Sequence, residues 1–101
     1  MRKFDPSRHL TTPEAVATYL DEVLQLNDKD TFIAALGDVA KAQGMAKIAA
    51  EAGVGRESLY KSLSEKGNPS FETVMKVLKA LGVQMGVRPK QSKRKRQLAY
   101  I

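Results

Sequence analysis

Side chains able to contact DNA are concentrated between residues 56 and 64. If this segment is a helix with Leu59 and Leu63 facing the core, one outward row holds several polar side chains, namely Arg56, Glu57, Tyr60, Lys61 and Ser64, with Ser58 beside them. Arginine can donate two hydrogen bonds to guanine, glutamate can accept one from cytosine, and lysine or tyrosine can contact a base edge or a phosphate. We therefore expect this row to bind DNA.

The elements that must position this row are two short helices. Apolar spacing predicts one helix over residues 45–52 and another over residues 56–65, joined by Gly53-Val54-Gly55. Two short helices linked by a glycine-containing turn are typical of a helix-turn-helix, although helical bundles that never bind DNA also contain them. Ala49 permits close approach of the helices, Gly53 permits a positive φ, and the remaining contacts are apolar, from Ile48, Ala52, Val54 and Leu59.

Three further helices complete the predicted fold. A helix ending near Leu24 begins with a capping box of Thr11 and Glu14, and one over residues 29–43 has Asp28 as N-cap and Gly44 at its end. The last helix follows Ser70, faces the core through Phe71, Val74, Met75, Leu78 and Leu81, and stops at Gly82. Alternation over residues 83–87 predicts a short strand that pairs with its copy in a homodimer.

The predicted fold class is all-α, a five-helix bundle with a helix-turn-helix, a short C-terminal strand and a basic flexible tail. Residues 1–87 form the helix-turn-helix domain with its N-terminal helical extension, and residues 88–101 form a tail that we expect to be disordered.

Charge is distributed unevenly along the 101-residue chain, which has a formal net charge of +6. Residues 1–87 hold eleven bases and eleven acids, so the whole excess lies in the tail, at Arg88, Lys90, Lys93, Arg94, Lys95 and Arg96. Residues 13–38 carry a net −5 and residues 41–87 a net +3. A basic surface beside a basic tail indicates a polyanionic partner, and the acidic half suits a basic partner.

Several classes of site and location are disfavoured by the composition. The chain has no cysteine and a single histidine, His9, beside no acidic cluster, so we expect no metal, no cofactor and no catalytic triad. The longest apolar run is five residues, 32–36, far below the ~20 that a membrane span needs. We expect a cytoplasmic, nucleoid-associated protein that is not an enzyme.

From Gly44 to Val87 the sequence resembles the Xre and phage-repressor helix-turn-helix superfamily, with a turn at residues 67–70 and a helix from Phe71 before Gly82-Val83. More narrowly, Tyr19-Leu20, residues 34–40, Gly44-Met45 and residues 56–61 resemble the probable addiction-module antidote family, of the HigA kind. This resemblance implies an antitoxin that binds a RelE/HigB-like ribonuclease toxin and represses its own operon.

The sequence departs from the superfamily pattern at two places. Gly44-Met45-Ala46 stands where many members have Thr-Gln, a cap and phosphate contact, so Lys47 or Lys41 must contact the phosphates instead. Ser62 stands where an apolar residue is usual, and the adjacent Leu63 can fill that part of the core.

Three interpretations stay open. The first is a dimeric antitoxin that binds double-stranded operator DNA and a ribonuclease toxin. The second is a freestanding phage-type repressor without a toxin, and the third is an adaptor that binds only protein. For the toxin surface the candidates are carboxylates of the acidic half, Asp21, Glu22, Asp28 and Asp30, which otherwise serve as caps and solvated charges. The tail is a clamp on the DNA backbone, a solubilising appendage, or a chance match to a nuclear-import patch.

Overall fold

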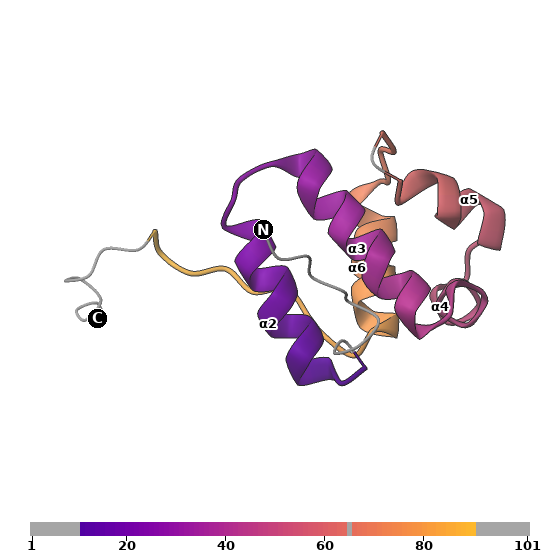
Figure 1. The fold of residues 1–101 in the computed structure, drawn as a ribbon, viewed down its shortest axis with the longest axis horizontal. Coiled ribbons are helices and arrows are strands. Elements are labelled where there is room, and N and C mark those ends of the chain that lie inside the picture. The colour runs from indigo at the N-terminus through magenta and orange to yellow at the C-terminus, as the bar shows by residue number, and fades with distance from the viewer. Residues whose placement is uncertain (1–10, 65, 91–101) are drawn as a thin grey trace, which may run out of the picture.

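The computed structural model describes residues 11–64 and 66–90. Over these residues the chain forms five helices, α2 (Pro13–Leu24), α3 (Lys29–Gln43), α4 (Met45–Ala52), α5 (Arg56–Ser62) and α6 (Phe71–Ala80). Helix α2 packs on α3, and α4 contacts α3, α5 and α6 (Figure 1). The all-helical prediction is confirmed for this part of the chain.

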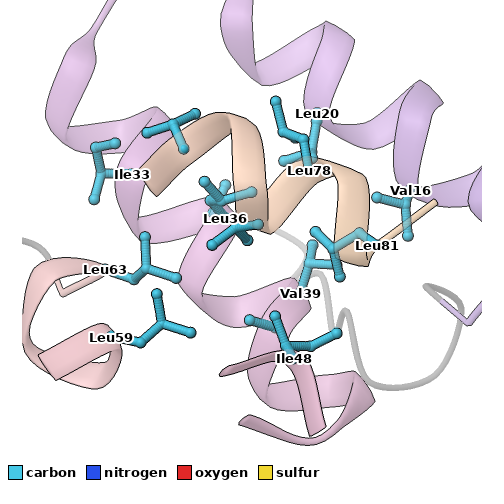
Figure 2. Close-up of a cluster of buried hydrophobic side chains, with 14 of the residues drawn as sticks. Val16, Leu20, Ile33, Leu36, Val39, Ile48, Leu59, Leu63, Leu78 and Leu81 are labelled. Carbon is cyan, nitrogen blue, oxygen red and sulfur yellow. The ribbon is translucent and has the colours of Figure 1, made fainter. Parts of the chain in front are cut away.

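Helix α3 supplies the centre of the core. Its apolar side is buried, at Phe32, Ala35, Leu36, Val39 and Ala40. Figure 2 shows the side chains that converge on this helix from its neighbours, among them Val16 and Leu20 of α2, Ile48 of α4, and Leu78 of α6. No buried side-chain nitrogen or oxygen among the described residues lacks a hydrogen-bond partner, so the core is apolar without a polar defect.

The start of α2 differs from the prediction by one residue. Thr12, not Thr11, is the N-cap, and its Oγ1 accepts a hydrogen bond of 3.1 Å from the backbone N–H of Ala15. This register puts Pro13 at the first helical position, where its missing N–H and restricted φ cost nothing. The predicted capping box of Thr11 and Glu14 is therefore wrong.

The predicted N-cap of α6 is confirmed, but only some of the residues predicted to face the core are buried. Ser70 is the N-cap, and its Oγ accepts a 3.1 Å hydrogen bond from the N–H of Thr73. Val74, Val77 and Leu78 are buried, whereas the side chains of Phe71 and Met75 are 65% and 48% exposed. The core covers only one narrow side of this helix, so two positions of the predicted stripe lie outside it.

Residues 83–87 form no strand, which corrects the prediction from their alternating pattern. The described part of the chain holds no other strand to pair with them, and an extended segment without a partner cannot form ladder hydrogen bonds. Instead, the N–H of Val83 donates a 3.0 Å hydrogen bond to the carbonyl of Leu78, which ends α6 in a tight turn. The pairing of this segment with a second copy stays a prediction.

Gly37 permits a close approach between α3 and the backbone that follows α5. It is buried in the middle of α3, and a Cβ added there would collide with the backbone carbonyl of Leu63, just after α5. Glycine is unfavourable inside a helix, and this contact explains its presence. The end of α5 can therefore lie this close to α3 only because residue 37 has no side chain.

We expect Gly37→Ala to lower the free energy of unfolding. Overpacking costs about 1–3 kcal/mol, which outweighs the gain of roughly 0.5–1 kcal/mol that alanine brings to a helix. Urea unfolding monitored by circular dichroism measures the difference. The matched control is Gly86→Ala, whose added Cβ meets nothing within 4 Å. An unchanged or more stable Gly37→Ala protein would contradict the close contact.

Candidate nucleic-acid interface

A glycine turn sets the direction of α5 relative to α4. Gly53 adopts the left-handed conformation at φ 74°, which a residue with a Cβ rarely adopts. The N–H of Val54 donates a 3.0 Å hydrogen bond to the carbonyl of Ala49, and the Val54 side chain packs against the core. The chain therefore reverses within three residues, and α5 begins at Arg56.

One side of α5 is anchored and the other faces solvent. Leu59 and Leu63 are 1% and 3% exposed, as the sequence predicted. The side chains on the remaining surface are exposed, namely Arg56, Glu57, Ser58, Tyr60 and Lys61. The predicted row is thus brought together on one helix, directly after the turn.

The end of α5 comes earlier than the predicted residue 65. The helix ends at Ser62, where the side-chain hydroxyl donates a 3.2 Å hydrogen bond to the carbonyl of Leu59. Ser64 lies beyond the helix, exposed, and its hydroxyl donates a 2.8 Å hydrogen bond to the carbonyl of Lys61. Serine hydroxyls compete for backbone carbonyls and favour helix ends. Ser64 is therefore placed beside the row and not on the helix that carries it.

Helix α3 contributes a cation to the same surface. The Nζ atom of Lys41, in the last turn of α3, lies 5.1 Å from the centroid of the Tyr60 ring, within the range of a cation–π contact. Lys47 is exposed on α4. The sequence pattern named Lys41 as a phosphate contact, but nothing in the spacing of residues 41 and 60 indicated that they meet. The contact restrains the exposed Tyr60 ring over the end of α3.

The four acidic candidates for a protein partner are divided between two hollows. Asp28 and Asp30 line one of about 500 Å³ between α2 and α3, with Tyr19 and Asp38. Asp21 and Glu22 line another beside residues 83–88. Asp28 is the N-cap of α3 as predicted, but its carboxylate makes no capping bond to the backbone and accepts a 2.6 Å hydrogen bond from the hydroxyl of Thr31.

A tail residue contacts one of these acids. The Arg88 Nη2 atom lies 3.2 Å from Oδ1 of Asp21. The candidate DNA clamp and the candidate toxin surface therefore share an ion pair, which their separation in the sequence did not indicate. Lys90 is exposed, and the remaining basic candidates of the tail, Lys93, Arg94, Lys95 and Arg96, lie outside the described residues.

Other kinds of site find no support in residues 11–64 and 66–90. No group of three or more His, Asp or Glu side chains there is placed to hold a metal ion. None of the helices in this part of the chain has the length and apolar character needed to cross a membrane. His9 lies outside the described residues.

Comparison with known proteins shows the family of this chain. The model of a family described as "Probable addiction module antidote protein" matches residues 1–89. The chain belongs to this family. A protein of Haemophilus influenzae, described as an uncharacterized protein, is 49% identical over 87 residues, covering 86% of this chain and 90% of that relative. No solved structure matches the chain significantly.

Membership in the antidote family confirms part of the resemblance seen in the sequence. An antidote protein neutralises a toxin, so the family implies a toxin partner. Proteins of this kind are generally not enzymes. Family membership alone does not identify the toxin or assign a role in DNA binding.

The acidic hollow between α2 and α3 perturbs one tyrosine. Burial raises the pKa of Tyr19 above its ordinary value, and the nearby Asp38 carboxylate raises it further. Since the folded-state pKa lies above the unfolded one, the phenol's contribution to stability is complete below about pH 10 and is lost as the pH rises through the folded-state pKa.

We expect Asp38→Asn to lower the pKa of Tyr19 while leaving it above the ordinary value, because burial is the larger cause. Titration of the Tyr19 ring signals by NMR measures the change. Asp30→Asn serves as the control, since it removes a carboxylate from the same hollow but not the one that acts on Tyr19. Equal pKa changes in the two variants would contradict this assignment.

Proposed function

We propose that this antidote protein binds operator DNA as a helix-turn-helix formed by α4 and α5, neutralises a RelE/HigB-like ribonuclease toxin and represses its own operon. The observation that carries the DNA-binding part is the solvent-exposed surface of α5, which includes Arg56, Tyr60 and Lys61, while Leu59 and Leu63 are buried in the core. A helix of this kind fits the major groove, which is about 12 Å wide.

Within this proposal the exposed side chains divide by role. Arg56 reads guanine through two hydrogen bonds and Glu57 accepts from cytosine, while Ser58, Tyr60 and Lys61 contact base edges or phosphates. Lys47 on α4 and Lys41, held against Tyr60, contact the phosphates, with Ser64 beside them. Neutralised phosphates supply affinity, and the α5 contacts supply sequence preference.

The DNA-binding form is a homodimer. A seven-residue α5 reaches only a few base pairs, so two copies about 34 Å apart, in successive major grooves, are needed for a specific operator. Such a protein is located in the cytoplasm with the nucleoid. A freestanding phage-type repressor would bind DNA in the same way, but the antidote family implies a toxin and so favours the antitoxin.

The acidic half of the chain provides the toxin surface. A ribonuclease binds RNA and is therefore expected to be basic, which makes carboxylates the complementary groups. Asp21, Glu22, Asp28 and Asp30 are exposed on α2 and at the start of α3. In Figure 1, α2 lies on the other side of α3 from α5, and the start of α3 lies between them. DNA and toxin can then be bound at the same time.

The DNA-binding part is tested by Arg56→Ala and Lys47→Ala. We expect Arg56→Ala to weaken operator binding by about 1–3 kcal/mol with little effect on random DNA, because it removes a base contact. Lys47→Ala should weaken binding to both DNAs about equally, because a phosphate contact carries no sequence information. Gel shifts with the protein's own promoter and a scrambled duplex measure the ratio. Equal losses for Arg56→Ala on both duplexes would place base recognition elsewhere.

The toxin part is tested with the small open reading frame next to this gene. We expect a basic, ribonuclease-like product whose toxicity is relieved by co-expression of this chain. Reversal of Asp21 and Glu22 to lysine should slow its association several-fold and weaken the salt dependence of the rate. The control is Glu51→Lys, an exposed acid on α4. An unchanged association rate in the double variant would put the toxin on another surface, and the absence of such a gene would favour the freestanding repressor.

A further inference from the structure

The hollow beside α2 is lined by both apolar and acidic residues. It measures about 690 Å³ and lies between α2 and residues 83–88, which run past this helix (Figure 1). Leu24, Phe32, Leu78 and Met85 contribute apolar surface to it. The carboxylates of Asp21 and Glu22 belong to the same lining.

The outer wall of this hollow is attached at two points of unequal strength. At one end, Val83 packs against the core and its N–H is bonded to the carbonyl of Leu78. At the other, Arg88 pairs with Asp21 through side chains that are 69% and 48% exposed. Exposed ion pairs are weak and are screened by salt. The Arg88 end can therefore be displaced while the Val83 end stays in place.

Such a lining is complementary to a long cationic side chain. Arginine and lysine place their aliphatic stems along apolar surface and keep their charged ends on polar groups. A guanidinium also matches a carboxylate in geometry, since it can donate two parallel hydrogen bonds. Arg88 shows that Asp21 accepts a guanidinium, because its Nη2 atom already donates to this carboxylate.

We propose that this hollow is the docking site for an arginine-bearing segment of the basic toxin, and that Arg88 is its competitor within the chain. This inference rests on the proposed function, whose acidic surface it narrows to the Asp21 side of α2. Binding of the toxin arginine displaces Arg88 from Asp21. Arg88 then becomes available to DNA phosphates.

Linkage gives the size and the sign of this coupling. Breaking the pair of Arg88 with Asp21 raises the affinity of the chain for both toxin and DNA. By linkage, the toxin therefore increases the affinity for DNA by the same factor as DNA increases the affinity for the toxin. An exposed ion pair is worth a factor of about two to five in an equilibrium constant. The effect is therefore a modest mutual enhancement that declines as the salt concentration rises.

A hexa-arginine peptide tests the docking site without the toxin. Titration of the full chain, followed by amide chemical shifts, should move signals of α2 around Asp21 and of residues 83–88. Arg88→Gln should tighten peptide binding about two- to fivefold because the competitor is gone. The matched control is Lys90→Gln, which removes the same charge two residues further on and should not tighten binding. Equal tightening in both variants, or shifts centred on Asp28 and Asp38, would overturn the proposal.

The link to DNA is tested on the same full chain. Asp21→Asn should strengthen DNA binding about two- to fivefold at low salt, because Arg88 is no longer held. Asp30→Asn, in the hollow between α2 and α3, changes the net charge by the same amount and should have a smaller effect on DNA binding. Equal strengthening in the two variants would overturn the coupling. If the unchanged chain and both variants all fail to bind DNA, the proposed function is contradicted instead. The peptide titration tests the docking site independently of DNA binding.

Discussion

The burial of α3 is the constraint on which the other elements depend. A chain of this length buries a limited share of its surface, so its core is small and a few elements supply most of it. Seven of the fifteen residues of α3 are buried. One region of the helix receives α2, another receives α4, and Gly37 admits the backbone that follows α5. Both candidate surfaces are therefore positioned by elements that pack on this helix.

The sequence predicted those elements whose packing follows a simple period. The helix over residues 29–43, the glycine turn after α4 and the Ser70 cap were all recognisable, because local spacing and cap chemistry determine them. Details that depend on the surroundings were missed. Phe71 and Met75 follow the helical period but lie outside the limited core, and residues 83–87 alternate like a strand without a partner strand among the described residues. Periodicity indicates which faces are apolar, not how much of each face the rest of the chain covers.

The candidate surfaces were predictable as sets of residues but not as arrangements. The exposed side of α5 followed from the positions of Leu59 and Leu63 on a single helix. The contact of Lys41 with Tyr60 and the pair of Arg88 with Asp21 join residues that are distant in the sequence, so tertiary structure alone brings them together. The same holds for the division of the acidic residues between two hollows. Charge counts along the chain gave the sign of each half but not the neighbours of any carboxylate.

The placement of opposite charges on one small chain has a physical consequence of its own. A chain with a net −5 in one segment and a basic tail of six charges attracts itself as well as its partners. Among residues 11–64 and 66–90 the structure shows one such contact, at Asp21, where it is exposed and therefore weak. A strong pair would hold the tail against both partners, and the absence of any pair would leave the two surfaces independent. The exposed pair of Arg88 with Asp21 is intermediate between these two cases, because it forms in the free chain but is weak. A partner that offers Asp21 another guanidinium, and buries apolar surface as well, has the stability needed to replace it.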